Sequence, residues 1–477
     1  MLSYNQLAGR RSPAGEYLPT AIGLSLPDCT ESKMMNVRSN YCRGSCGLTV
    51  LVTLLAACAP TVILESPTQA TGPPASPEGQ LSSTSAVAAP PTIGPLPTCR
   101  SSTATGCTYS PTSGTRALDL SHGTCTGEGS RRLIASPMRL SDIGWILPMG
   151  MMTGGHVTPI DHQYYYPADF HSAPDTYEVY SPMEGNIVVV GIDKEQVNPP
   201  DKISVIIEGS CTFWVLYHLL TSLTPELSQQ ALPRPGESSA VRIPVAAGQV
   251  IGLIGGRTLD FSVVSSEVTL SGFIVPEHYA AEAGKLHVVD PFDYFEEPLR
   301  SQLLALNMRT AEPLGGKIDY DIDGRLIGNW FIEGTNGYAG YFPDRQPRPA
   351  NYSSTHLAIV PDGLDPSVYT ISIGSLLPNE QNQFGILGNV PDPAQVSVGT
   401  GPVAFELVQI GYVDAEGHLM HGLDHFVSSL YRKDSLQVMG TVLMQLLEDR
   451  RLEVEVFMGR RASQVDGFTS AAVIYER

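Results

Sequence analysis

The densest group of side chains able to bind a metal lies in the last quarter of the sequence. It contains three histidines and three acidic residues: Asp414, Glu416, His418, His421, Asp424 and His425. Imidazole and carboxylate side chains are common ligands of zinc. The three histidines would share one face only in a helix, whereas residues 414–417 have the composition of a hairpin turn. We therefore interpret this segment as a solvated loop rather than a metal site.

A second group has the spacing of the start of a calcium-binding loop. Three aspartates alternate with other residues just before a glycine: Asp319, Asp321, Asp323 and Gly324. The position where such a loop needs a bidentate glutamate is Trp330. Tyr320 and Ile322 also alternate with the aspartates, as on a half-buried strand. We therefore do not expect calcium here.

The elements that position these side chains belong to a long, acidic and turn-rich chain. Its 477 residues are enough for two or three folded units. Its 46 glycines and 38 prolines indicate many turns. Acidic residues outnumber basic ones by 48 to 29, giving a net charge of -19. Affinity for nucleic acid rests on neutralising phosphates with Lys and Arg, so we expect no nucleic-acid partner.

One apolar stretch near the N-terminus indicates secretion. Residues 47–57 are too few to cross a bilayer as a helix. They follow Arg38 and Arg43, which is the order of a signal peptide. We expect translation to start at Met34 or Met35, which leaves residues 1–33 upstream of the true start.

The apolar stretch ends in a sequence that resembles the lipobox of bacterial lipoproteins. It reads Leu-Ala-Ala-Cys and ends at Cys58, so residues 34–58 would be a lipoprotein signal peptide with a lipidated cysteine. We therefore predict a bacterial cell-surface or periplasmic protein that meets the membrane only through the lipid on Cys58. An ordinary secreted protein cut near Ala57 is the alternative.

Residues 59–131 are rich in Pro, Ser and Thr and predict a disordered linker, because they contain too few large apolar residues to form a core. Beyond Cys58 four cysteines remain in the expected oxidising compartment: Cys99, Cys107, Cys125 and Cys211. Three pairings are possible, and the sequence does not choose among them.

From residue 132 the sequence predicts an all-β unit that extends to residue 298. Short apolar runs are separated by Gly and Pro, without a long helical period. The candidate strands are residues 177–180, 186–191, 203–208, 213–219 and 250–254. Parallel strands joined by helices have no room in this spacing.

Five segments of this unit resemble, in order, the lysostaphin-type or LytM-like zinc endopeptidases that cut peptidoglycan, which share the duplicated hybrid motif. They are residues 155–161, 177–188, 216–219, 245–255 and 289–295. Each fragment is short, but their order predicts the family's antiparallel β-sheet fold. In that family zinc is held by His, Asp and a second His, and two further histidines assist the reaction.

The resemblance assigns the site residues only in part. His156 matches the first metal ligand, and Asp161 the second, although Asp161 lies one residue further on than the family's spacing, so that His162 becomes a rival ligand. Asp260 stands where the last ligand histidine would be, and Thr258 replaces an assisting histidine. Only His218 remains as a catalytic histidine.

These departures lead to two functional expectations. The first is a catalytically impaired, peptidase-like domain that binds peptidoglycan, a surface glycan or a partner hydrolase. The alternative is an active metalloendopeptidase with a rearranged site, in which one divalent metal, zinc by resemblance, is held by His156, Asp161 or His162, and Asp260. We expect no other cofactor. A purely structural envelope protein is the third possibility.

Three consecutive tyrosines, Tyr164, Tyr165 and Tyr166, follow the first predicted ligands. Consecutive side chains of a strand face opposite sides, so we expect at least one ring to face the cleft. There it would stack on a sugar or pack against a partner. The alternative is that the rings cover the edge of the sheet.

Residues 299–477 predict a second β-rich domain. A helically spaced segment, residues 296–308, links it to the first. About seven or eight strands follow, which indicates a sandwich or an up-and-down barrel. Residues 328–330, Gly-Asn-Trp, are similar to the Gly-x-Trp that opens a lipocalin barrel, but three residues identify no family.

Overall fold

The computed structural model of this chain describes residues 120, 125, 127–193, 202–344, 352–374, 376, 382–420 and 429–477. All of them belong to one compact unit. The predicted upstream segment, the signal peptide with Cys58, and most of the linker lie outside the described residues. So do Cys99 and Cys107, and the three C-terminal members of the histidine cluster: His421, Asp424 and His425.

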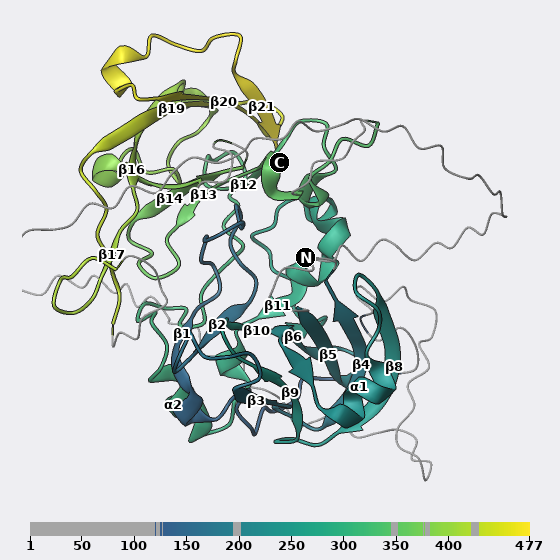
Figure 1. Ribbon diagram of the computed structural model, residues 1–477. Helices are drawn as coiled ribbons and strands as arrows, with labels where there is room; N and C mark the ends of the chain where they lie inside the picture. Colours follow the sequence, from purple (N-terminus) through teal and green to yellow (C-terminus); the bar gives the residue numbers. More distant parts are fainter. Residues whose placement is uncertain are drawn as a thin grey trace, which may run out of the picture. The chain divides into compact units, whose positions relative to one another are not determined.

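The first half of the described chain is built on an antiparallel eight-stranded sheet. Its order is β1-β2-β10-β6-β5-β4-β8, with β11 paired to β10. The strands are β1 (Ile143–Leu147), β2 (Gln163–Pro167), β4 (Gly185–Ile192), β5 (Ile203–Ser210), β6 (Phe213–Leu220), β8 (Ser238–Val245), β10 (Leu259–Ser265) and β11 (Val288–Val289). Figure 1 shows β4, β5, β6 and β8 side by side.

A smaller sheet and one short helix complete this half. The sheet has the order β3-β9-β7, from β3 (Tyr177–Tyr180), β9 (Val250–Ile254) and β7 (Ser222–Leu223). Helix α1 (Pro225–Ala231) begins after Thr224, whose hydroxyl accepts a hydrogen bond from the Leu227 backbone. The turn before β9 contains Gly248, with a φ of 75° that favours glycine.

The central strands form because their apolar side chains are buried on both faces. All seven residues of β10 are buried, and six of the eight in β5. The main core joins the sheets through β-branched and aromatic side chains, among them Val205, Ile207, Phe213 and Phe261. Continuous apolar runs of this kind are what a strand covered on both sides requires, so the all-β prediction is confirmed.

A disulfide fastens the start of this half to the β5–β6 hairpin. Cys125 is bonded to Cys211, which selects one of the pairings that the sequence left open. Gly129 accepts a hydrogen bond from the Ser210 hydroxyl, and Arg131 donates one to the Gly209 carbonyl. The folded unit therefore includes residues that we assigned to the linker.

Removal of this disulfide is expected to lower stability. Its cysteines are 86 positions apart, and cross-linking a long loop stabilises a protein by about 2–4 kcal/mol, largely through the unfolded chain. We expect the Cys125→Ser/Cys211→Ser double variant to lose this amount in urea unfolding. Reducing agent should lower the wild-type midpoint and leave the double variant unchanged; equal responses would contradict the prediction.

The second half forms a closed barrel, the second of the two architectures expected. Neighbouring strands pair in chain order: β12 (Gly328–Ile332), β13 (His356–Pro361), β14 (Tyr369–Ile373), β15 (Gln383–Ile386), β16 (Val403–Gln409), β19 (Val438–Leu447), β20 (Arg451–Met458) and β21 (Val473–Glu476). Alternate side chains fill the interior, including Trp330, Ile359, Phe405 and Met444. Closure leaves no free sheet edge.

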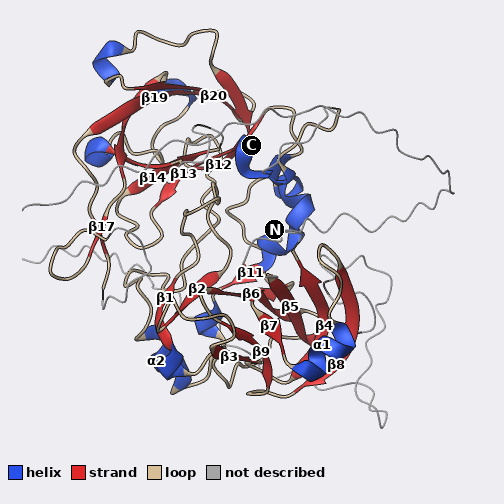
Figure 2. Cartoon of the chain, viewed as in Figure 1, coloured by secondary structure: helices blue, strands red, loops and turns tan. Residues whose placement is uncertain are grey.

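The segment between the halves differs from the expected helix. Helix α2 covers only Leu299–Leu304. It ends early because the following backbone runs beside β1: Ile146 donates to the Leu306 carbonyl at 2.8 Å, and Met308 donates to the Ile146 carbonyl at 2.9 Å. Figure 2 shows how little helix there is beside the strands. In the described part of the chain, no helix is long and apolar enough to span a bilayer.

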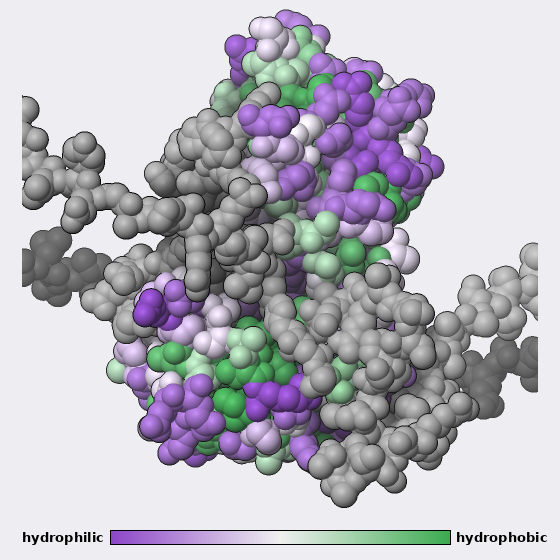
Figure 3. Space-filling model, turned by 90° about the vertical axis from the view of Figure 1, so that its right-hand side faces the viewer, coloured by the Kyte–Doolittle hydropathy of each residue, from purple (hydrophilic) through white to green (hydrophobic). Residues whose placement is uncertain are grey.

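Most of the buried apolar side chains belong to four clusters. The face in Figure 3 is mainly hydrophilic in its upper part, and hydrophobic side chains gather in its lower part.

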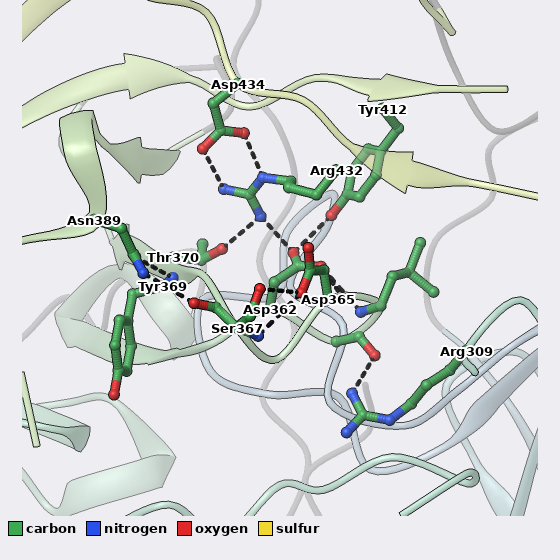
Figure 4. Close-up of polar contacts among 12 residues, drawn as sticks. Arg309, Asp362, Asp365, Ser367, Tyr369, Thr370, Asn389, Tyr412, Arg432 and Asp434 are labelled. Carbon is green, nitrogen blue, oxygen red and sulfur yellow. Dashed lines mark hydrogen bonds and ion pairs between the residues drawn. The ribbon is translucent and has the colours of Figure 1, made fainter. Parts of the chain in front are cut away.

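A short hairpin, β17 (Tyr412–Val413) and β18 (Tyr431–Arg432), is anchored by a buried arginine. Figure 4 shows the Arg432 guanidinium between Asp362 and Asp434. It forms ion pairs with both and donates to the Thr370 hydroxyl at 2.9 Å. Arg432 therefore joins β18 to the β13–β14 connection and to the segment before β19.

Candidate functional site

The structure brings together the residues that the sequence singled out. Asp260 of β10 lies opposite His218 of β6 on one side and opposite Tyr164 of β2 on the other. Asp161 and His162 directly precede β2, and the ring centroids of His156 and His162 are 5.8 Å apart. The antiparallel pairing of β2, β10 and β6 thus gathers residues from distant parts of the chain.

His162 lies between two carboxylates. Its Nδ1 is 3.1 Å from Asp161 Oδ1, and its Nε2 is 3.3 Å from Asp260 Oδ2, an ion pair without the angle of a hydrogen bond. Burial lowers the pKa of His162, but Asp260 and the hydrogen bond to Asp161 outweigh burial, so that its pKa is raised. The two carboxylates therefore favour the protonated form of His162.

Lys285 is the residue of the site that the sequence reasoning missed. It extends from a 3-10 helical segment, Pro276–His287, which is kinked at Glu282, and only 2% of Lys285 is exposed. Its Nζ lies 3.3 Å from Asp161 Oδ2, donates to the Pro159 carbonyl at 3.1 Å, and lies 5.0 Å from the centroid of the Tyr338 ring. No motif marks Lys285, which is 126 positions after Pro159.

The pKa values of the two carboxyl groups of the site are shifted in opposite directions. Burial disfavours ionisation of Asp161, but Lys285 and the hydrogen bond from His162 outweigh it and hold its pKa well below the usual range. Burial raises the pKa of Asp260 to about 6, although His162 opposes this. The Thr258 hydroxyl donates to the other Asp260 oxygen at 3.4 Å. Asp161 is therefore the permanent anion of the site.

His156 lies beside this cluster as a neutral ring. Burial lowers its pKa to about 3, and the cationic His162 and Lys285 act in the same direction. Two residues of the second half hold its backbone: Ser353 donates to the Gly155 carbonyl at 2.9 Å, and Gln383 donates to the His156 carbonyl at 3.1 Å. The predicted ligand loop is thus fixed by contacts from beyond residue 298.

His218 lies in an irregularity of β6. Two residues of β6, His218 and Leu219, oppose only Ser204 of β5, which is a β-bulge, and Leu219 has a φ of 71°. A left-handed backbone is unfavourable for leucine. The bulge leaves His218 exposed, whereas its neighbours on β6 are mainly buried.

A zinc site needs imidazole nitrogens with free lone pairs and carboxylate oxygens directed at one point. The present donors do not meet this requirement. Asp161 faces His162 with one oxygen and Lys285 with the other, and the two nitrogens of His162 face different carboxylates. Together, His156, Asp161, His162 and Asp260 therefore do not fit the predicted metal centre.

Within the described ranges, three potential ligand atoms lie within 4.8 Å of one another only in Asp414, Glu416 and His418. Asp414 accepts backbone hydrogen bonds from Glu416 and His418, and its other oxygen is 3.0 Å from His418 Nδ1. These contacts build the exposed hairpin turn that the sequence predicted.

The three tyrosines are buried rather than exposed. Tyr164 contacts His162 edge-on at 4.8 Å between centroids, and Tyr166 stacks on Trp145 at 4.9 Å. Leu364 and Leu430 from the second half belong to the same apolar cluster. This burial favours the alternative in which the rings cover the sheet, because a ring that stacks on a sugar would have to be exposed.

One further acidic residue and two aromatic residues adjoin the cluster. Glu282 forms a hydrogen bond with Tyr338, and burial, with help from Asp161, raises its pKa to about 7. Tyr338 in turn lies 5.4 Å from Tyr352 between ring centroids. Side chains of the second half thus line the site next to Lys285.

The raised pKa of Glu282 predicts a pH-dependent stability. Between pH 4.5 and 7 the folded protein keeps a proton on Glu282 that the unfolded chain releases, so this residue makes folding less favourable as pH rises through that window. At about 1.4 kcal/mol per pKa unit, the effect reaches up to about 3 kcal/mol. Relative to wild type, the free energy of unfolding of the Glu282→Gln variant should rise by this amount between pH 4.5 and pH 8. Urea unfolding measures it. A pH-independent difference would contradict the assignment.

Comparisons with known proteins found a similarity in structure but none in sequence. The chain matches no protein-family model and no curated protein. Among solved structures it is similar to a solution NMR structure of lysostaphin, with 12% identity, a TM-score of 0.21, and coverage of 72% of this chain and 90% of that chain.

Proposed function

We propose that this chain is a non-hydrolytic protein of the bacterial cell envelope, with a peptidase-like sheet domain that binds peptidoglycan. One observation supports the absence of hydrolytic activity. The carboxylates predicted as metal ligands are already paired with basic side chains of the protein, Lys285 and His162. A surface glycan and a partner hydrolase are the other ligands that the resemblance allows.

The chemistry of the cluster supports this proposal. Hydrolysis of a peptide bond requires a group that accepts a proton from water. Both nitrogens of His162 face carboxylates, and the two Asp161 oxygens face His162 and Lys285. None of these three groups is available to activate water.

The proposed location rests on the sequence and on the disulfide. The lipobox-like segment ending at Cys58 supports export and lipidation. The Cys125–Cys211 bond supports an oxidising compartment, where such bonds persist. We infer anchoring at the envelope through the lipid on Cys58.

The test is to incubate the full chain, in detergent, with purified peptidoglycan sacculi. We expect the protein to sediment with the sacculi without releasing soluble fragments, and equally well in chelator and in zinc. Absence of co-sedimentation would contradict peptidoglycan binding. Chelator-sensitive release of fragments would instead establish the active metalloendopeptidase.

The His156→Ala variant is the matched control for that alternative. In the proposed protein His156 holds no metal, so the variant should release no less material than wild type and contain no less zinc by elemental analysis. A stoichiometric zinc content that falls in His156→Ala would favour the enzyme.

A further inference from the structure

In the buried cluster each carboxylate that was predicted as a metal ligand lies beside a basic side chain of the protein. Asp161 lies beside Lys285 and His162, and Asp260 lies beside His162. Burying an unpaired charge is very unfavourable. The position of each cation next to a carboxylate therefore explains how four ionisable groups are tolerated in the interior.

The surroundings of Lys285 match the needs of an ammonium group. Its three N–H donors have three electron-rich neighbours: Asp161 Oδ2 at 3.3 Å, the Pro159 carbonyl at 3.1 Å, and the Tyr338 ring at 5.0 Å. Pro159 and Asp161 belong to the loop that carries His156, and Tyr338 belongs to the second half. One cation thus contacts the loop and the segment that lies over it.

We propose that Lys285 is a built-in cation that does the structural work of a bound metal in this site. Its ammonium holds Asp161 beside His162 and fixes residues 156–162 against the second half, so the site folds without a divalent ion. This inference rests on the non-hydrolytic site of the proposed function, but it is independent of which ligand the protein binds.

The test is a double-variant cycle on the full chain, followed by urea unfolding. Wild type should unfold at the same midpoint in chelator and in zinc. Lys285→Met should lower the midpoint because Asp161 is left buried without its ammonium. Adding Asp161→Asn to Lys285→Met should recover at least half of that shift, because the uncompensated charge is removed.

Three results would overturn the inference: a wild-type midpoint that zinc raises and chelator lowers, a Lys285→Met midpoint equal to that of wild type, or a double variant no more stable than Lys285→Met. If Lys285→Met shows no cooperative transition, recovery of a transition in the double variant gives the same answer. Lys285→Arg, which keeps the charge, should shift the midpoint less than Lys285→Met.

The outcomes separate the two proposals. A failed cycle with intact, non-hydrolytic binding to sacculi would refute only the role of Lys285. A successful cycle without binding to sacculi would refute only peptidoglycan binding.

Discussion

Replacement of Arg432 by Met is expected to lower the free energy of unfolding by about 3–5 kcal/mol, the cost of removing one partner from a buried ion pair. The Arg432 side chain is 2% exposed, and those of its partners Asp362 and Asp434 are 5% and 20% exposed. Without the guanidinium, both carboxylates lose their cation. Tyr412 would still donate to Asp362 at 2.8 Å, so Asp362 keeps one side-chain donor. Urea unfolding followed by tryptophan fluorescence measures the loss.

Arg432→Lys is the matched control. It keeps the charge but loses the paired hydrogen bonds to Asp434, so its loss should be smaller than that of Arg432→Met. A loss below about 1 kcal/mol in Arg432→Met would place this network with exposed ion pairs, which contribute little.

Arg477→Met is expected to cost a similar amount, about 3–5 kcal/mol, by opening one end of the barrel. The Arg477 side chain is 3% exposed and pairs with Asp321 at 3.2 Å. Its guanidinium lies 3.9 Å from the centroid of the Trp330 ring and donates to the Ile327 carbonyl at 2.5 Å. The variant would leave the Asp321 carboxylate buried without a cation.

The pH dependence distinguishes this explanation from simple loss of packing. Burial already raises the pKa of Asp321, and Arg477 opposes the rise. In Arg477→Met the folded-state pKa should rise further, so the variant should lose stability as pH rises above the usual aspartate range. Its deficit relative to wild type should be larger at pH 7 than at pH 5. A constant deficit, or no rescue by Asp321→Asn, would contradict the charge argument.

The ion pair between Arg477 and Asp321 also explains why the first strand of the barrel begins with glycine and contains tryptophan. Gly328 has a φ of 118°, and a Cβ there would lie 2.2 Å from an Asp321 oxygen and 2.4 Å from an Arg477 nitrogen. The indole of Trp330 gives Arg477 a flat surface and donates to the Leu326 carbonyl at 2.9 Å. Asp321 thus serves an ion pair within the protein rather than calcium.

In the first half local patterns predicted β3, β4, β5, β6 and β9, but not β1, β2, β8 or β10 of the main sheet. The bounds predicted for β3 and β9 agree with the structure, because apolar runs and turn residues act over a few positions. β15 was missed, since it has four residues with a glycine inside. That glycine, Gly385, is explained only by tertiary contact: a Cβ there would lie 1.8 Å from Asp434 Oδ2.

The candidate site was predictable by residue type but not by partner. The family resemblance pointed to His156, Asp161, His162, His218 and Asp260, and the structure places them on or next to the neighbouring strands β2, β10 and β6. The stacking role considered for the tyrosines depended on exposure, which the packing of Leu364 and Leu430 removes.

The sequence by itself determined that this chain is acidic and all-β, since composition and short-range periodicity carry that information, and a family resemblance pointed to the imidazoles and carboxylates of one region. Only the tertiary structure decided what those groups do. The state of Asp161 depends on the approach of Lys285 from a distant segment, and no spacing rule encodes such an approach. Charge pairing in a buried site follows from distances in space.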